Sequence, residues 1–363
     1  MSGDESLSEL RERIDEIDRN VVAELNERLR IVERIREAKA REGTPIFDPA
    51  REEEVLEKVR AANGGFFPEA SLRKVFREVI SASISRQKPL NIGFLGPEAT
   101  FTHRAAQDTF GSSARFTAFR TIPEIFRAVE RGAVDYGVAP VENSIQGSVF
   151  ETLDSLVEAD LRIVAERRLR IDHCLISRSP LEGIRKVYSK DQALGQCRDW
   201  LARTLPSAEL VETTSTAHAV EIAASEDGAA AIASSLAAEQ FDIPILERGI
   251  QDRRGNHTRF LVLGRPDAVA PVPTERARTA LVLSLQDAPG ALQSALSVFS
   301  ERGINLSRIE SRPSRRKAWD YLFFIEFTGN EEDPDVREAL SLLRRKCAFV
   351  KELGSFPLAD ELD

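Results

Sequence analysis

The most constraining feature of the sequence is a helical apolar stripe within its first forty residues. Its apolar side chains recur at spacings of three, four or seven, which is the period of one face of an α-helix; they are Leu10, Ile14, Ile17, Val21, Leu25, Val32 and Ile35. A helix of about nine turns is unusually long for a globular domain. The stripe therefore requires partner helices along its length, either from this chain or from another copy of it.

Two shorter stripes complete an all-helical segment. Thr44-Pro45 interrupts the first helix, Asn63-Gly64-Gly65 ends the second, and Lys88-Pro89 ends the third. The second stripe is carried by Val55, Leu56 and Val59, and the third by Leu72, Val75, Phe76, Val79 and Ile80. We therefore predict an all-α domain at residues 1–88.

The hydrophobic period changes after this segment. Short apolar runs of strand length alternate with amphipathic helical segments, which indicates an α/β domain at residues 90–266. Residues 267–277 are rich in Pro and Ala and predict a linker. Residues 278–363 follow the order strand, helix, strand, strand, helix, strand, the ferredoxin-like order of an α+β domain. We expect a multidomain protein.

Composition excludes several classes of protein. The formal net charge of -9 disfavours a general nucleic-acid partner, and the longest apolar runs are too short for a transmembrane helix. The acidic N-terminal segment has no apolar core of a signal peptide. Cys174, Cys197 and Cys347 lie far apart without a partnering His cluster, which argues against disulfides and a metal site. We expect a cytoplasmic protein without a metal, nucleic-acid or membrane partner.

Polar residues occupy seven positions where the helical stripes call for apolar ones. Arg28 and Lys39 are eleven residues apart, so they point within about 20° of each other at a separation of roughly 16 Å and could close on one small anion. The other positions are Asp48, Arg51 and Glu52 in the second helix and Ser83 and Gln87 in the third. Buried charges need partners, which a bound dicarboxylate would supply. The alternative interpretation places these residues at solvent-exposed helix ends.

The helical segment resembles the all-helical chorismate mutases. The resemblance rests on LRERID at 10–15, FDPAREEE at 47–54, ISASISRQ at 80–87 and the spaced pair Arg28 and Lys39. It implies that Arg11 and Arg28 hold substrate carboxylates and that Lys39 and Gln87 face the ether oxygen. It further implies that Glu52 positions the ring hydroxyl with support from Asp48 and Arg51, and that Ser83 donates to a carboxylate.

The position of Arg11 has a consequence for assembly. Arg11 precedes Arg28 by seventeen residues, which is about 25 Å along the axis and roughly 100° around the helix. It cannot reach the same small ligand from the same helix. If Arg11 is catalytic, it comes from a second protomer, so we expect an intertwined homodimer or a higher homo-oligomer.

Four polar clusters at predicted strand ends indicate a ligand crevice in the α/β segment. They are GPEATFTH at 96–103, APVENSIQGS at 139–148, VYSKDQALGQC at 187–197 and NHTRF at 256–260. As an ordered set they resemble prephenate dehydratase across residues 91–264. The resemblance implies two α/β lobes around a cleft, similar to periplasmic binding proteins. It also implies that Thr258, Arg259 and Phe260 lie at the catalytic centre, with Asn143, Ser189 and Gln196 lining the pocket.

Several roles in this pocket stay open. A Thr hydroxyl is too weak an acid for neutral pH, so Thr258 is interpreted as a hydrogen-bond donor to the leaving hydroxyl, with the proton source unassigned. Glu142 is a conceivable acid, and Arg259 either holds a carboxylate or forms a salt bridge. The sequence departs from the family at Lys190-Asp191, where His-Pro is usual, and at Ala99, where Gly is common.

The C-terminal segment resembles the ACT domain of prephenate dehydratases. DAPGAL at 287–292 joins a strand to a helix, and ESRP at 310–313 ends the next strand. The resemblance implies that phenylalanine binds between paired domains. The residues implied are Gly290, Ala291, Leu292, Asn305, Glu310, Ser311, Arg312 and Pro313.

The combined prediction is a bifunctional enzyme of phenylalanine biosynthesis without a cofactor. It would convert chorismate to prephenate and prephenate to phenylpyruvate, with phenylalanine as inhibitor. The sequence has no GxGxxG after a strand, which disfavours a nicotinamide-dependent dehydrogenase. Three alternatives remain: a dehydratase acting on arogenate, a non-catalytic protein that binds a small acid, and a helical segment that serves only for dimerisation.

Overall fold

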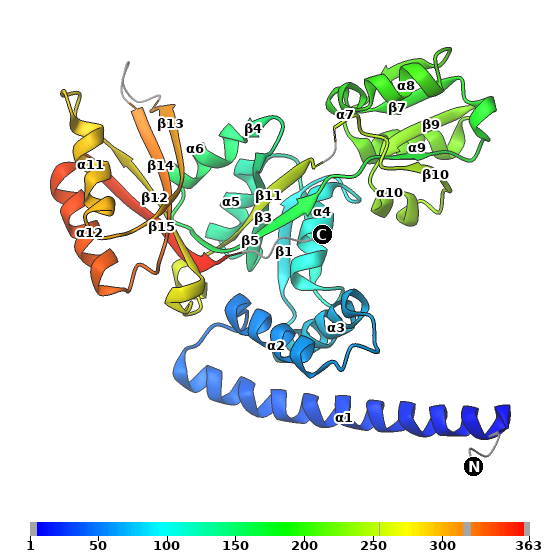
Figure 1. Ribbon diagram of the computed structural model, residues 1–363, viewed down its shortest axis with the longest axis horizontal. Coiled ribbons are helices and arrows are strands. Elements are labelled where there is room, and N and C mark those ends of the chain that lie inside the picture. Colours follow the sequence, from blue (N-terminus) through cyan, green and yellow to red (C-terminus); the bar gives the residue numbers. More distant parts are fainter. Residues whose placement is uncertain (1–5, 254, 315–320, 359–363) are drawn as a thin grey trace. The chain divides into compact units, whose positions relative to one another are not determined.

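The computed structural model describes residues 6–253, 255–314 and 321–358, which form two compact units (Figure 1). One unit holds the N-terminal helices together with Phe110–Ala114. The other holds Asn91–Thr109 and the described chain from Arg115 onward. No helix in the described ranges is both long enough and apolar enough to cross a membrane.

The helical unit contains α1 (Leu7–Glu42), α2 (Pro49–Ala62) and α3 (Glu69–Gln87). Helix α1 begins with a capping box in which Ser6 and Glu9 bond each other's backbone N–H groups, and it ends at Gly43 in the left-handed conformation, φ +68°. Asp48 caps α2 by accepting from the backbone N–H of Arg51 at 2.9 Å. The breaks between the three helices therefore fall where the sequence predicts them, after α1 near Thr44-Pro45 and after α2 at Asn63-Gly64-Gly65.

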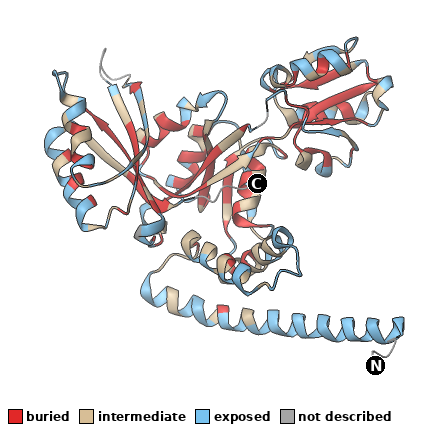
Figure 2. Cartoon of the chain, viewed as in Figure 1, coloured by how far each residue is buried: buried red, intermediate tan, exposed pale blue. Residues whose placement is uncertain are grey.

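Helix α1 is exposed over most of its length (Figure 2). Within Leu7–Glu42, Val32 alone is buried, and the apolar stripe lies open at Ile14 (57% exposed) and Ile17 (59%). Single exposed apolar residues are ordinary, but a continuous stripe of this length indicates a covered face. The described chain therefore does not supply the partner that the stripe requires along its N-terminal half.

The α/β domain consists of two lobes, as predicted. The first lobe is a mixed sheet of order β2-β1-β3-β11-β5, with β4 added to β3. Its elements are β1 (Asn91–Leu95), α4 (Phe101–Phe110), β2 (Arg115–Phe119), α5 (Ile122–Glu130), β3 (Tyr136–Asn143), β4 (Gly147–Ser148), α6 (Phe150–Glu158), β5 (Arg162–Arg170) and β11 (His257–Gly264). Strand β11 runs antiparallel between β3 and β5, so the returning chain completes this lobe.

The second lobe is inserted between β5 and β11. Its sheet has the order β10-β6-β9-β7-β8. Its elements are β6 (Cys174–Ile176), η1 (Leu181–Gly183), β7 (Lys186–Ser189), α7 (Asp191–Gln196), α8 (Arg198–Thr204), β8 (Glu209–Glu212), α9 (Thr216–Ser225), β9 (Ala229–Ala233), α10 (Ser235–Gln240) and β10 (Ile245–Arg248). Helices α7 and α8 are separated at Cys197, where the Asp252 carboxylate accepts from the backbone N–H groups of Asp199 and Trp200.

The C-terminal domain has the ferredoxin-like order that the sequence predicts. Its antiparallel sheet is ordered β13-β14-β12-β15. The elements are β12 (Ala277–Ser284), α11 (Ala291–Ser300), β13 (Leu306–Pro313), β14 (Tyr321–Thr328), α12 (Pro334–Lys346) and β15 (Phe349–Pro357). Two 3-10 turns, η2 (Pro266–Ala268) and η3 (Thr274–Arg276), precede β12.

The C-terminal sheet buries both of its faces. Leu281 and Leu283 of β12 pack with α11 and α12 on one face, whereas Ala280 and Val282 join the core of the first lobe on the other. At Gly354 of β15 the two domains approach so closely that a Cβ atom would lie 2.6 Å from the carbonyl oxygen of Ile163. The C-terminal sheet and the sheet of the first lobe therefore share one continuous core.

Candidate active sites

In the helical unit, Arg28 and Ser83 come together from α1 and α3. The Arg28 guanidinium donates to the Ser83 hydroxyl, which donates in turn to the carbonyl of Val79 at 2.6 Å. Burial lowers the pKa of Arg28, and Ser83 is only 4% exposed. Two residues that the sequence places in one site, 55 positions apart, thus form a partly buried polar pair.

Lys39 lies where α1 turns into α2. Its ammonium donates to the carbonyls of Pro45 at 2.8 Å and Ile46 at 3.0 Å. Burial lowers the pKa of Lys39, and the nearby carboxylates of Asp48 and Glu52 act in the opposite direction. Lys39 is thus a half-buried cation that two backbone carbonyls satisfy and that lies near two acids.

The remaining residues predicted in this unit fall into two groups. The buried side-chain oxygen of Gln87 has no hydrogen-bond partner among the described residues, so it is available to accept a hydrogen bond from a ligand. Arg11 and Arg51 are exposed in the single chain, and Arg51 pairs with Glu54 at 2.5 Å. Arg11 is therefore far from a complete site within its own protomer.

A cavity of about 450 Å³ lies between the two α/β lobes. Four of the predicted residues line it: Asn143, Gln196, Thr258 and Phe260. The lining also includes Thr100, Phe101, Ile171, His173, Lys190, Gln192, Thr216 and Asn256. Lys190 therefore puts a cation at the cavity.

Asn143 and Thr258 form the centre of the polar wall. The Asn143 side-chain oxygen accepts from the backbone N–H groups of Ile145 and Gln146, each at 3.0 Å. Its amide nitrogen donates to the Thr258 hydroxyl oxygen at 2.9 Å. Because that oxygen already accepts a hydrogen bond, and no acceptor for its proton lies among the described residues, Thr258 is set up to donate into the cavity.

Two buried side chains extend this wall, and neither was singled out from the sequence. The Asn256 amide nitrogen donates to the Gln196 side-chain oxygen at 3.0 Å, and His173 Nε2 lies 2.8 Å from the same oxygen. The His173 ring packs edge-on against Phe101 with centroids 5.8 Å apart. Asn256 belongs to the NHTRF cluster but was not assigned a role. His173 immediately precedes an apolar strand, so from the sequence it resembles a core residue.

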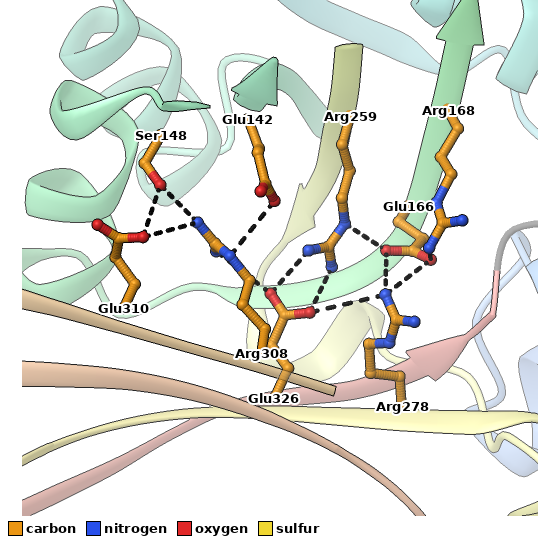
Figure 3. A network of polar contacts seen from close by, with 9 residues as sticks. All are labelled: Glu142, Ser148, Glu166, Arg168, Arg259, Arg278, Arg308, Glu310 and Glu326. Atoms are coloured by element: carbon orange, nitrogen blue, oxygen red, sulfur yellow. Dashed lines mark hydrogen bonds and ion pairs between the residues drawn. The ribbon is translucent and has the colours of Figure 1, made fainter. Parts of the chain in front are cut away.

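Arg259 is not among the residues that line the cavity. Figure 3 shows it within a network of ion pairs. It is 8% exposed and pairs with Glu166 at 2.5 Å and with Glu326 at 2.8 Å. The reason is strand alternation: Thr258 and Phe260 project to one face of β11, and Arg259 projects to the other. In this structure Arg259 therefore forms buried ion pairs on the side of β11 away from the cavity lining.

Ser189 is likewise displaced from the cavity lining. Its hydroxyl is fully buried and donates to the carbonyl of Ile232 on the neighbouring strand β9 at 2.6 Å. A Ser at the end of a central strand can satisfy its hydroxyl within the sheet, and Ser189 does so. Its prediction as a pocket residue is therefore not supported by this geometry.

Glu142 does not serve the cavity either. Its carboxylate lies 3.3 Å from Arg308 of β13, which also donates to Ser148 at 2.7 Å and lies 3.5 Å from Glu326 (Figure 3). The conceivable role of Glu142 as a general acid therefore loses its geometric basis. Arg308 instead joins the C-terminal sheet to Glu142 of β3 and Ser148 of β4.

Residues predicted to bind phenylalanine lie in two environments. Gly290 adopts the left-handed conformation at the start of α11, φ +78°, with exposed Leu292 beside it. On β13, Glu310 accepts from Ser148 at 3.1 Å, and Arg312 pairs with Asp154 at 2.5 Å and lies over the Phe150 ring. Asn305, Ser311 and Pro313 are exposed, whereas Ala291 is half-buried. Glu310 and Arg312 thus face the dehydratase lobe.

These three domains and their polar sites define a multidomain enzyme with a fused regulatory module. Family models match them in order: chorismate mutase type II at 10–88, prephenate dehydratase at 92–268 and ACT domain at 279–341. A bifunctional chorismate mutase/prephenate dehydratase of Aquifex aeolicus is 46% identical over 98% of this chain and 99% of its own. The chain belongs to the bifunctional chorismate mutase/prephenate dehydratase family.

Solved structures resemble the part of the chain beyond the helical domain. A prephenate dehydratase of Arthrobacter aurescens, solved in complex with L-Phe, is 34% identical with a TM-score of 0.69, covering 75% of this chain and 92% of that one. A structure described as a novel type of quorum-quenching acylase is 28% identical with a TM-score of 0.68, covering 75% and 98%. The full-length relative, unlike these two, matches all three domains.

Proposed function

We propose that the chain rearranges chorismate to prephenate in its helical domain and converts prephenate to phenylpyruvate in the cavity of its α/β domain. Phenylalanine, sensed by the C-terminal domain, inhibits the second step. The observation that carries the proposal is the match of all three domains, in order, to a bifunctional relative. The hydrogen-bonded pair Asn143 and Thr258 at the cavity wall supports it independently.

The mutase step needs neither a nucleophile nor a proton. A Claisen rearrangement is accelerated by holding a compressed conformer and by donors aimed at the ether oxygen as its bond to carbon breaks. In this proposal Arg28 and Ser83 hold a substrate carboxylate, and Lys39 and Gln87 face the ether oxygen. Glu52 positions the ring hydroxyl, with Asp48 holding the start of α2 beside it.

The site is completed by a second copy of the chain. Arg11 lies on the exposed N-terminal half of α1, where the apolar stripe is also uncovered. Pairing of two α1 helices would bury this stripe and bring Arg11 of one protomer to the Arg28 site of the other. We therefore propose a homodimer with composite mutase sites.

The dehydratase step breaks two bonds of prephenate. The electron pair of the carbon–carboxylate bond enters the ring as carbon dioxide leaves, and hydroxide departs with the electron pair of its bond to carbon. Thr258 donates to the departing oxygen, and water is formed when that oxygen gains a proton. Gln196 and Lys190 offer N–H donors to the substrate carboxylates, and Phe260 contributes an apolar wall for the ring.

Phenylalanine is proposed to bind at the C-terminal domain, in pairs of that domain. The Arthrobacter aurescens relative was solved in complex with L-Phe, which supports phenylalanine as the ligand. The backbone turn at Gly290 opens a helix N-terminus toward an amino-acid carboxylate, and Ala291 and Leu292 flank it. Two further exposed residues belong to the proposed set: Asn305 immediately precedes β13, and Ser311 lies on it.

One experiment tests the whole proposal. Purified protein is supplied with chorismate, and prephenate and phenylpyruvate are followed with and without phenylalanine. We expect both acids to appear in sequence and phenylpyruvate release to fall when phenylalanine is added. Prephenate accumulation without phenylpyruvate would overturn the dehydratase assignment in favour of a binding protein, and faster turnover of arogenate than of prephenate would change the substrate.

A further inference from the structure

The hydrogen bonds along the polar wall of the dehydratase cavity determine which side-chain atoms are donors and which are acceptors. The Asn143 oxygen accepts from two backbone N–H groups, which cannot act as acceptors. The amide of Asn143 therefore cannot be flipped without losing both hydrogen bonds. Its nitrogen must face the opposite way, toward Asn256 and Thr258.

The orientation of the Asn143 amide also determines the orientation of the next side chains along the wall. The Asn143 nitrogen donates to the Asn256 oxygen at 2.8 Å, so Asn256 turns its own nitrogen toward Gln196 at 3.0 Å. The atom of Gln196 on this side must then be its oxygen. His173 Nε2 lies 2.8 Å from that oxygen and therefore has to carry a proton.

The other ring nitrogen of His173 is then a bare acceptor. His173 is 3% exposed, and its Nδ1 is buried without a hydrogen-bond partner among the described residues. A proton at Nδ1 would leave a buried donor unpaired, which is unfavourable. Burial accordingly lowers the pKa of His173, although Gln196 and Asp172 act in the opposite direction. The ring is neutral, with its proton on Nε2.

We propose that His173, together with Asn256, is a positioning residue of the dehydratase: both donate to the Gln196 oxygen and thereby turn the Gln196 amide N–H groups toward the substrate. This inference rests on the proposed dehydratase function of the same cavity. The Gln196 amide nitrogen has no partner among the described residues, and Gln196 lines the cavity. Its two N–H donors fit a substrate carboxylate, which accepts and never donates when ionised. His173 acts through Gln196 and does not need to touch substrate.

The test compares two substitutions of one residue. His173→Gln can place an amide N–H near the position of Nε2, whereas His173→Leu keeps an apolar side chain without a donor. We expect His173→Leu to raise KM for prephenate by about two- to tenfold, the effect of one hydrogen bond, with little change in kcat. His173→Gln should recover most of the loss. His218→Gln, at an exposed histidine of α9, is the matched control.

Two further measurements keep the test decisive if a variant folds poorly. Tryptophan fluorescence, to which Trp200 of α8 contributes, reports whether the α/β domain of each preparation is folded. In the wild-type protein, nitrogen-15 NMR of labelled histidine should show His173 neutral and protonated at Nε2. A proton on Nδ1 instead, equal KM values for His173→Leu and wild type, or equal losses in both His173 variants would overturn the proposal. A wild-type chain without dehydratase activity would overturn the proposed function and leave the NMR result standing.

Discussion

Arg308 of the regulatory strand β13 and Glu142 of the catalytic strand β3 lie 3.3 Å apart, joining the two domains. Glu142 immediately precedes Asn143, whose side chain holds Thr258. Arg308 also contacts Ser148 and lies near Glu310, next to the exposed Ser311. A shift of β13 on phenylalanine binding would therefore be felt one residue from the cavity.

We expect Arg308→Lys to weaken inhibition by phenylalanine. Lysine keeps the charge but cannot reach Glu142, Ser148 and Glu326 together as a planar guanidinium does. The loss of coupling should be about 0.5–2 kcal/mol, which raises the half-inhibitory phenylalanine concentration by at least about twofold. Inhibition curves at fixed prephenate measure it, with Arg344→Lys on the exposed face of α12 as control. An unchanged curve for Arg308→Lys would exclude this route.

Glu326→Gln should destabilise the unit that contains the dehydratase and regulatory domains. Glu326 is 5% exposed and neutralises Arg259, Arg278 and Arg308, so its removal leaves buried cations short of one partner. Breaking a buried ion pair in this way costs about 3–5 kcal/mol. Urea unfolding followed by tryptophan fluorescence would measure the change. Glu301→Gln at the exposed end of α11 should leave the midpoint unchanged.

Thr258→Val should abolish most dehydratase activity and spare the mutase. Valine keeps the shape of threonine but has no hydroxyl to donate to the leaving oxygen, and loss of one such donor lowers kcat by about 10²–10³. Phenylpyruvate formation from prephenate measures the effect. Prephenate formation from chorismate by the same preparation is the internal control, and a kcat within threefold of wild type would refute the role of Thr258.

Mixing two inactive mutase variants tests the composite site. Arg11→Ala and Lys39→Ala should each lose nearly all mutase activity, because one removes a carboxylate ligand and the other the main electrostatic donor. When the two chains are unfolded and refolded together, hybrid dimers regain one intact site, so roughly a quarter of wild-type activity should return. If Lys39→Ala retained its activity, the helical domain would be only a dimerisation element. If mixing restored nothing, Arg11 would not act across protomers.

Stability should fall as the pH drops below neutrality. Burial lowers the pKa of both His103 and His173 from the ordinary value of 6.5. The unfolded chain then binds protons near pH 6.5 that the folded chain does not, so the stability present above this pH is lost as the pH falls toward the folded-state pKa values. Urea midpoints at about pH 7.5 and about pH 5.5 measure the loss. Replacing both residues by Gln should make the two midpoints more nearly equal; an unchanged difference would contradict the assignment.

The architecture followed from periodicity, because each domain type has its own hydrophobic repeat. Asn143 ends β3 and Thr258 lies near the start of β11, and both line the cavity. Polar clusters at strand termini were therefore a usable signal for the crevice. The sequence left Arg259 open between a carboxylate ligand and a salt bridge, although strand alternation alone separates its face from that of Thr258 and Phe260. His173 was missed because it precedes an apolar strand that looks like core. The Arg308–Glu142 contact joins positions more than 160 residues apart, and no local pattern encodes it.

The chain passes from one lobe to the other after β5 and returns before β11, and His173 and Asn256 stand at those two crossings. The Asn256–Gln196 hydrogen bond therefore ties a crossing segment to helix α7 of the second lobe. Any rotation of one lobe against the other has to pass through these two crossings. The aim of the Gln196 N–H groups is consequently coupled to the angle between the lobes.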